Sequence, residues 1–223
     1  EWHLKGAFLP RAERAGVGLI ETLRFDPNEG FVREAAHLAR LRQSAEWLGI
    51  AVDEAGLQAA LAGVHSTTPL RVRIELQPAG TTVLTTAPLP TSAGPLAVAI
   101  ATHTVERANP FLAHKTTARE LFNAATQFAA ANGFADIIFT NEAGEITEGA
   151  ISSVFVKRGA ALRTPPLSAG LLPGVLRAEL LASGKAQEAT LYPADLLGAQ
   201  VFIGNSLRGL REVQVRAERV SWY

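Results

Sequence analysis

The chain contains no cysteine among its 223 residues. Disulfides, thiolate metal sites and cysteine nucleophiles are therefore excluded, and the absence of disulfides fits a reducing compartment. No apolar run approaches the roughly 18 residues that a membrane helix needs. The first fourteen residues also lack the basic-then-apolar pattern of a secretory signal. Together these absences predict a cytoplasmic protein with no membrane partner.

The sequence has no excess of charge of either sign, since 21 basic residues balance 21 acidic ones. A nucleic-acid partner is therefore not expected. Apolar residues make up 48% of the chain and charged residues 19%, which is ordinary globular composition. The five histidines show no metal-ligand spacing, so no metal site is expected. The length suffices for one large domain or two small ones, with a buried core.

The first ninety residues predict a small α+β domain. Leu38, Leu41, Ala45 and Leu48 recur at spacings of three and four, which is typical of a helix. The expected elements are a strand over 16–25, helices over 33–48 and 53–63, and a hairpin of 70–76 with 81–87. The next stretch, PLPTSAGP (88–95), holds three prolines and a glycine and predicts a linker. We expect domains at 1–92 and 93–223.

The second part of the chain predicts a larger domain of mixed strands and helices. Short β-branched runs bounded by glycine, proline or asparagine indicate its strands, and TARELFNAATQFAAANG indicates a helix closed by Asn-Gly. The expected elements are strands over 96–102, 135–141, 145–157, 160–164 and 200–206, helices over 117–133 and 174–183, a strand and short helix within 187–197, and an edge strand over 212–222.

Lys115 and Glu148 are the first candidate catalytic residues. Lys115 precedes the predicted helix 117–133, and Glu148 lies in EITEGA after the following strand. A desolvated lysine amine forms a Schiff base with an aldehyde. A carboxylate at the far side of a pyridine ring keeps its nitrogen protonated, so that the ring accepts electrons. Taken alone, each residue is commonly a solvated surface group, but the pair would suit pyridoxal phosphate.

A phosphate site is indicated by GLLPGV (170–175). Pro173 and Gly174 suit the central positions of a type II turn that leads into a helix, whose first N–H groups attract an anion. The alternative is a simple helix start, because the Walker ending is absent. GNS (204–206), at a strand end, offers a further hydroxyl and amide. Arg40 is a candidate side-chain cation, unless it lies on a solvated helix face.

Several arginines are candidate partners for a substrate carboxylate. Arg71 and Arg73 are two apart on a predicted strand and therefore share one face. Arg24 and Arg107 are similar candidates. The alternative is that these side chains simply face solvent. Ser152 and Ser153 lack the G-x-S-x-G elbow, so the sequence gives little support to a serine hydrolase.

With these residues in view, nearly the whole chain resembles the class IV, fold-type IV pyridoxal-phosphate enzymes, and most closely the aminodeoxychorismate lyases. The resemblance is carried, in order, by IETLR (20–24), HLARLRQSA (37–45), HKTTAR (114–119), ITEGAISSVF (146–155), LLPGVLR (171–177) and GNSLRG (204–209). It implies a two-domain α+β fold, with a small α+β domain and a larger pseudo-barrel domain, and commonly a homodimer.

The resemblance also implies roles for individual residues. Lys115 corresponds to the Schiff-base lysine, Glu148 to the carboxylate at the pyridine nitrogen, and Arg40 to the cofactor-phosphate arginine. The remaining cofactor contacts implied are Leu172, Gly174, Val175, Leu176, Asn205 and Ser206. Thr22 is implied near a small-molecule substrate. The activity implied is conversion of 4-amino-4-deoxychorismate to 4-aminobenzoate and pyruvate, a step of folate biosynthesis.

Two alternatives stay open at the level of sequence. A class IV aminotransferase acting on branched-chain or D-amino acids uses the same lysine, so residues around Lys115 do not separate it from a lyase. A non-catalytic relative that keeps the fold for binding is the second alternative. It is suggested by two departures from the family, IELQPAG (74–80) in place of an arginine-glycine turn, and Ser153 where asparagine is common.

Overall fold

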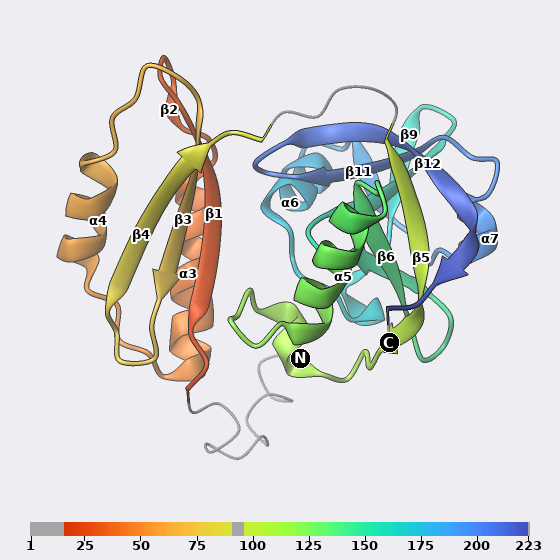
Figure 1. The fold of residues 1–223 in the computed structure, drawn as a ribbon, viewed down its shortest axis with the longest axis horizontal. Coiled ribbons are helices and arrows are strands. Elements are labelled where there is room, and N and C mark those ends of the chain that lie inside the picture. Colours follow the sequence, from red (N-terminus) through yellow and green to blue (C-terminus); the bar gives the residue numbers. More distant parts are fainter. Residues whose placement is uncertain (1–15, 91–95, 223) are drawn as a thin grey trace. The chain divides into compact units, whose positions relative to one another are not determined.

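The structure, a computed structural model, describes residues 16–90 and 96–222. The chain forms two compact units (Figure 1). The first unit contains residues 1–91 and also the short segment His114–Ala118; the second contains Ser92–Ala113 and Arg119–Tyr223. The predicted boundary between residues 92 and 93, and most of the predicted linker, lie outside the described residues.

The first unit is an antiparallel sheet covered on one face by two helices. Its strand order is β2-β1-β3-β4. Leu19, Leu23 and Ile74 of the sheet pack against Leu38 and Leu57 of the helices. The predicted strand, helices and hairpin are confirmed to within a few residues. The elements are β1 (Leu19–Asp26), β2 (Gly30–Phe31), α3 (Glu34–Leu48), α4 (Glu54–Ala62), β3 (Leu70–Leu76) and β4 (Thr82–Pro88).

The second unit is a barrel-like sheet with helices outside it. Its strands run in the order β10-β9-β8-β11-β12-β5-β6-β7, and β7 also pairs with β8, which closes a ring of strands. The predicted α+β fold with a barrel-like second part is confirmed. The elements are β5 (Ala97–Val105), η2 (Pro110–Ala113), α5 (Glu120–Ala131), β6 (Asp136–Asn141), β7 (Ile146–Gly149), β8 (Ser153–Arg158), β9 (Ala161–Thr164), η3 (Leu167–Ala169), α6 (Val175–Ala182), β10 (Ala186–Glu188), α7 (Pro193–Leu196), β11 (Val201–Asn205) and β12 (Gly209–Val220).

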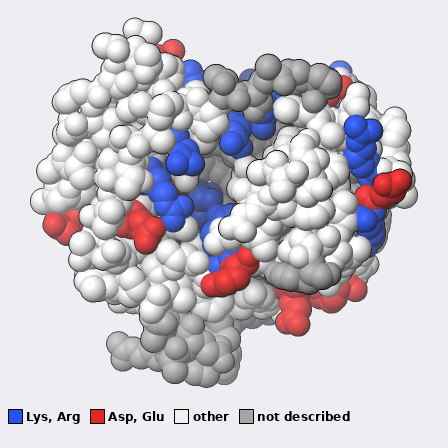
Figure 2. All heavy atoms as spheres, viewed as in Figure 1, with Lys and Arg blue, Asp and Glu red and all other residues white. Residues whose placement is uncertain are grey.

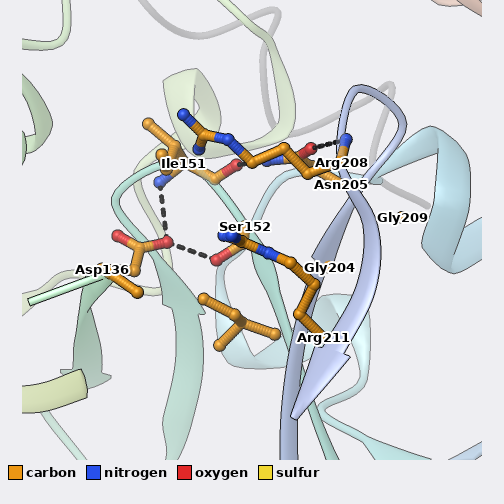
Figure 3. Close-up of a pocket in the computed structure, with 10 residues that line it drawn as sticks. Asp136, Ile151, Ser152, Gly204, Asn205, Arg208, Gly209 and Arg211 are labelled. Carbon is orange, nitrogen blue, oxygen red and sulfur yellow. Dashed lines mark hydrogen bonds between the residues drawn. The ribbon is translucent and has the colours of Figure 1, made fainter. Parts of the chain in front are cut away.

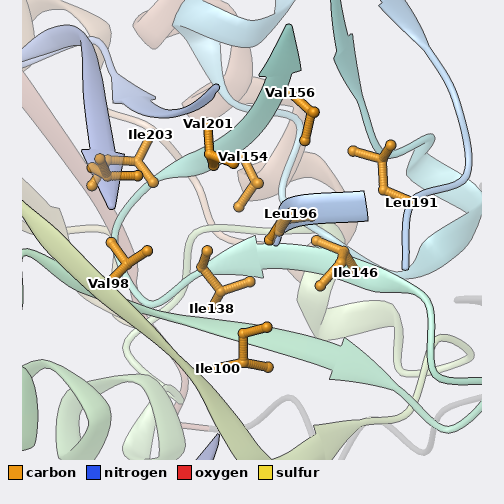
Figure 4. Close-up of a cluster of buried hydrophobic side chains, with 11 residues drawn as sticks. Val98, Ile100, Ile138, Ile146, Val154, Val156, Leu191, Leu196, Val201 and Ile203 are labelled. Carbon is orange, nitrogen blue, oxygen red and sulfur yellow. The ribbon is translucent and has the colours of Figure 1, made fainter. Parts of the chain in front are cut away.

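The barrel interior is filled by branched aliphatic side chains. Val98, Ile100 and Ile138 point into it, beside side chains from β7, β8 and β11 (Figure 4). Alternate residues on the same strands, Ala99 and Ile137, instead pack outward with α5. Both faces of β6 and of the first half of β5 are thus buried, which explains the apolar runs at 97–101 and 137–139.

Three sequence predictions are wrong in detail. The segment 212–222 is not an edge strand, because β12 lies between β11 and β5. The polar residues of the segment are exposed, including those at 216–219 beside a register shift. The single strand expected over 145–157 is two strands, β7 and β8, since the loop between them turns to bond Asp136. The helix expected from residue 117 begins at Glu120, because the N–H of Thr117 bonds the carbonyl of Gly18.

Basic and acidic side chains both appear on the face shown in Figure 2, and in several places they adjoin one another. Within residues 16–90 and 96–222, no helix is both long enough and apolar enough to cross a membrane.

Candidate active site

The backbone around Lys115 is fastened to strand β1. The N–H of Ile20 donates to the carbonyl of Lys115 over 2.8 Å. Two residues on, the N–H of Thr117 donates to the carbonyl of Gly18, and the N–H of Gly18 donates back to Thr117 Oγ1, each over 2.9 Å. Leu19 and Thr116 form an isolated β-bridge between these bonds. The segment therefore acts as a short extra strand of the first unit, and its lysine has a fixed backbone position.

Helix α3 holds the residue before the lysine. His114 Nδ1 lies 2.9 Å from Ser44 Oγ, and the His114 ring stacks on Trp47 with centroids 4.2 Å apart and planes 20° apart. Ser44 and Trp47 are three residues apart and share one helix face. The lysine segment is thus fixed by β1 on one side and by α3 on the other.

Arg40 lies on the same helix and is held by Glu21 of β1. Its Nε donates to Glu21 Oε1 over 2.8 Å and its Nη2 to Glu21 Oε2 over 2.7 Å. His37 Nδ1 reaches Oε2 as well, over 2.7 Å. Burial alone would raise the pKa of Glu21, but the charge of Arg40 and the hydrogen bonds from His37 and Arg40 lower that pKa to about 2. Glu21 is therefore an ionised carboxylate in a nearly closed site.

The candidate substrate arginines of the first unit share one sheet face. In the register of β1 and β3, Thr22 is opposite Arg73 and Arg24 is opposite Arg71. Their neighbours Leu23 and Val72 point to the helix-covered face, so this set points to the other face. Arg24 pairs with Asp26 and Arg73 with Glu75, each over 2.9 Å, and all four groups are partly exposed. The structure therefore brings Thr22, Arg24, Arg71 and Arg73 together.

Arg107 differs from that set. It belongs to the second unit, and its side chain is half exposed. Its Nε lies 3.1 Å from Glu142 Oε1, and its backbone N–H donates to Glu142 Oε2 over 3.0 Å. That backbone hydrogen bond, more than the guanidinium charge, lowers the pKa of Glu142. Arg107 thus shapes a surface loop of the second unit through Glu142.

Glu148 lies in β7 of the second unit, next to the predicted phosphate loop. The N–H of Leu172 donates to Glu148 Oε1 over 3.0 Å. Glu148 is paired with Ser153 of β8, and Ser153 is paired with Gly204 of β11. The candidate carboxylate and the start of the turn at 204–206 therefore lie on β7 and β11, on either side of β8. The loop at 170–175 adjoins them through its bond to Glu148.

The loop at Gly174 is not the type II turn predicted from Pro-Gly. Gly174 has φ −63° and ψ 136°, an extended conformation open to any residue, whereas the third position of a type II turn needs positive φ. A Cβ here would lie 2.6 Å from Ser153 Oγ, so the buried Ser153 hydroxyl would have to move to admit any other residue. Helix α6 begins directly afterwards with Val175 and Leu176 buried. The first N–H groups of a helix have no partner within the helix, and they favour an anion.

The turn after β11 places one hydroxyl in a buried position. Asn205 Oδ1 accepts the N–H groups of Leu207 and Arg208, and Asn205 Nδ2 donates to the carbonyl of Ile151 over 3.0 Å. These bonds fix the turn. Ser206 is 7% exposed, and its Oγ has no hydrogen-bond partner within the described residues. A buried hydroxyl of this kind is costly unless a ligand or water bonds it.

A buried network around Asp136 supports the loop that follows Glu148 (Figure 3). Asp136 accepts hydrogen bonds from Ser152 Oγ and from the N–H groups of Ile137 and Ile151. Burial raises the pKa of Asp136 to about 6 in spite of these bonds. Gly149 lies against this network, since a Cβ there would lie 2.8 Å from Asp136 Cγ. Asp136 thus helps to hold the loop between β7 and β8, together with the bonds from Asn205 and Arg119 to its carbonyl groups.

Sequence reasoning did not single out Glu21, His37 or Asp136. A signal for Glu21 was present, because it alternates with buried Leu19 and Leu23 in a strand that has one covered face. His37 and Arg40 are three apart on one helix face, which also indicated a shared partner. Asp136 offered no comparable signal, since it only precedes an apolar strand.

The family is decided by comparison with known proteins. The model of the amino-transferase class IV family matches residues 18–215, most of the chain. The chain belongs to the class IV amino-transferases. This family depends on pyridoxal phosphate, so the chain is a member of a pyridoxal-phosphate enzyme family.

Individual class IV relatives carry two kinds of name. A Schizosaccharomyces pombe protein provisionally named aminodeoxychorismate lyase is 32% identical over 206 residues, which cover 85% of this chain and 86% of that protein. A Mesorhizobium loti structure provisionally named amino-acid aminotransferase is 38% identical, with a TM-score of 0.82, covering 90% of this chain and all of that one. A Legionella pneumophila structure provisionally named 4-amino-4-deoxychorismate lyase is 25% identical, with a TM-score of 0.75, covering 90% and 83%.

The residues of this class IV chain fit the cofactor of its family. The buried Ser206 Oγ lacks a partner and is suited to a phosphate oxygen. Gly204 and Leu176 are in contact, since a Cβ on Gly204 would lie 2.9 Å from Leu176 Cδ2, so the turn and the start of α6 adjoin. Glu148, with one oxygen already held by Leu172, has the chemistry to bond a protonated ring nitrogen.

Proposed function

We propose that the protein is an aminodeoxychorismate lyase, which converts 4-amino-4-deoxychorismate to 4-aminobenzoate and pyruvate. The observation that carries the proposal is the relative of that name, 32% identical over most of both chains. Two features, each within its own unit, support it further: Lys115 is held against β1, and Glu148, Leu172 and Ser206 are suited to a cofactor. We also propose that the enzyme is a homodimer, as its family resemblance implies.

In this proposal Lys115 is both base and acid. Its amine removes the proton from the ring carbon that carries the substrate amine, and the resulting ammonium then donates a proton as the enolpyruvyl group leaves. Loss of that group makes the ring aromatic, which favours the forward direction. Bound pyridoxal phosphate supplies an electron sink for the pair left behind by the proton. The hydrogen bonds from β1 keep the lysine backbone in place through both transfers.

The other residues bind and orient. Glu148 holds the pyridine nitrogen, with its own position set by the N–H of Leu172. Arg40, Ser206 and the N–H groups at residues 174–176 hold the phosphate. Asn205 acts indirectly by shaping the turn that presents Ser206.

Arg24, Arg71 and Arg73, beside Thr22, are proposed to bind substrate carboxylates. The substrate has two carboxylates, and an arginine guanidinium binds a carboxylate through two parallel hydrogen bonds. The three arginines share one sheet face. Arg24 and Arg73 have acidic partners, but both pairs are partly exposed, so that a ligand can displace the acidic group. Arg107, which bonds Glu142 in the second unit, remains a weaker proposal for this role.

The second candidate is an amino-acid aminotransferase. It is favoured by the Mesorhizobium loti structure, which has the higher identity, 38%, and carries that name. A transaminase would use Lys115 to return the proton to the cofactor instead of expelling a leaving group. The two reactions therefore differ in product and not in the first proton transfer.

The deciding experiment incubates the pyridoxal-phosphate-loaded protein with 4-amino-4-deoxychorismate, and separately with branched-chain or D-amino acids plus 2-oxoglutarate. Equal amounts of 4-aminobenzoate and pyruvate support the lyase. Glutamate and a new 2-oxo acid support the aminotransferase. The lysine is tested by borohydride reduction followed by peptide mass analysis, with Lys115→Ala compared with Lys157→Ala, an exposed lysine. Turnover that survives Lys115→Ala overturns both enzyme proposals.

A further inference from the structure

Arg40 is held by a buried network that the family resemblance did not identify. Its guanidinium is bonded at Nε and Nη2 by the two oxygens of Glu21. Two bonds to one carboxylate fix both the position and the plane of the guanidinium, because an arginine fork and a carboxylate are coplanar in this arrangement. The edge of the guanidinium that carries Nη1 is therefore held in one orientation.

His37 completes the network from one turn before Arg40 on α3. It is 2% exposed and bonds Glu21 through Nδ1, while its Nε2 has no hydrogen-bond partner among the described residues. Because Glu21 is an ionised acceptor, the His37 proton must lie on Nδ1. His37 thus donates from Nδ1 to the second oxygen of Glu21.

The buried pair of Glu21 and Arg40 is expected to contribute little net stability, which indicates a role beyond stabilising the fold. Burying a charged pair usually gives little net stability compared with apolar residues of similar size. The neighbouring core of this unit consists of apolar side chains, mostly leucine and isoleucine, which would fill the same space. Without these partners, the long side chain of Arg40 would be free to change rotamer. It would then lose considerable side-chain entropy each time it bound an anion.

We propose that Glu21 and His37 are positioning residues that pre-orient Arg40 for the phosphate of the cofactor. The inference rests on the proposed function, in which Arg40 binds that phosphate. Pre-orientation removes the entropy cost of binding, and the shared carboxylate keeps Arg40 from adopting other rotamers. Glu21 also brings a negative charge close to the phosphate, so the proposal requires that orientation outweigh this repulsion.

The test measures the affinity of the apoprotein for pyridoxal phosphate and for pyridoxal, which lacks the phosphate, by absorbance and intrinsic fluorescence. Glu21→Gln is expected to weaken pyridoxal phosphate binding about tenfold, the lower end of the loss seen when a side chain that orients a metal ligand is removed. Pyridoxal affinity should stay within twofold. Arg40→Met should cause an equal or larger phosphate-specific loss, and the double variant should lose little more than Arg40→Met alone.

Glu54→Gln is the matched control. Glu54 bonds Arg42, also on α3, through the same two-bond geometry at 2.7 Å, but that pair is exposed. It should leave both affinities unchanged. For His37, His37→Asn keeps an N–H donor and should bind normally, whereas His37→Phe should show the phosphate-specific loss. These two variants keep the test valid if Glu21→Gln folds poorly, as judged by circular dichroism.

The outcomes distinguish a wrong assignment of Arg40 to the phosphate from a wrong positioning role for Glu21 and His37. If Arg40→Met changes both affinities equally or neither, the assignment of Arg40 to the phosphate fails. If Arg40→Met shows the specific loss while Glu21→Gln and His37→Phe bind normally or more tightly, only the positioning role is overturned.

Discussion

The carbonyl oxygen of Lys115 accepts a hydrogen bond from the N–H of Ile20 over 2.8 Å. Lys115 is proposed as the central base. The position of its backbone is therefore set by pairing with β1, which does not involve the lysine side chain. The same short pairing includes the N–H of Gly18, which bonds the hydroxyl of Thr117. Changes at Thr117 should thus act on Lys115 without touching it.

Thr117→Val keeps the shape of the side chain but removes the acceptor for the Gly18 N–H. We expect a loss of about 1–3 kcal/mol in unfolding free energy, measured by urea denaturation, because a partly buried donor loses its partner. Thr126→Val is the control, since the Thr126 hydroxyl only bonds back to the Phe122 carbonyl within α5. Equal losses in the two variants would contradict the special role of the pairing.

Gly149→Ala should destabilise the loop that carries Glu148. The added Cβ would lie 2.8 Å from Asp136 Cγ and 2.9 Å from Ser152 Oγ, both buried. Overpacking of this kind costs about 1–3 kcal/mol, which a thermal unfolding scan detects. At Gly63, after α4, a Cβ meets nothing closer than 3.5 Å, so Gly63→Ala should be nearly neutral. If Gly149→Ala left the unfolding temperature unchanged, the side chains of Asp136 and Ser152 would have to move aside at little energetic cost.

The raised pKa of Asp136 predicts an unusual pH dependence of stability. Its pKa is about 6 in the folded protein against 3.8 for an unperturbed group. Between these values the folded state binds more protons, so this group makes the unfolding free energy fall as pH rises from about 4 to about 6. Asp136→Asn should remove that contribution. Urea denaturation at several pH values in this window tests it, and parallel curves for the two proteins would count against it.

Glu21 should act in the opposite direction and at lower pH. Its folded pKa of about 2 lies below the ordinary 4.5, so its contribution is complete above about 4.5 and is lost as pH falls towards 2. Glu21→Gln should therefore flatten the acid limb of the stability curve. The exposed Glu54 serves again for comparison, because solvent screens its pair with Arg42 and Glu54→Gln should change the limb little.

Local pattern was sufficient to predict most elements and to name several candidate site residues. The helix over 33–48 and the hairpin strands followed from periodicity, since each buries one regular face. Lys115, Glu148 and the loop at 170–175 could be named because each stands in a short motif that needs no distant partner. The α+β family fold followed from the order of these motifs.

Pairings between distant residues could not be predicted in this way. The bond from Gly18 to Thr117 joins residues 99 apart, and the closure of the barrel depends on Glu148 meeting Ser153 after a loop bent by Asp136. Periodicity carries no information on which strands become neighbours. For the same reason β12 was assigned to an edge, although it lies between β11 and β5.

The return of residues 114–118 to the first unit has a consequence for synthesis of the chain. The amino-terminal sheet is translated long before the segment that bonds to β1, and part of the second unit, Ser92–Ala113, emerges in between. A nascent chain released or stalled before residue 118 therefore exposes the N–H of Gly18 and one side of β1 to water or to a chaperone. During translation, the first unit can complete its native contacts only after part of the second unit has been synthesised.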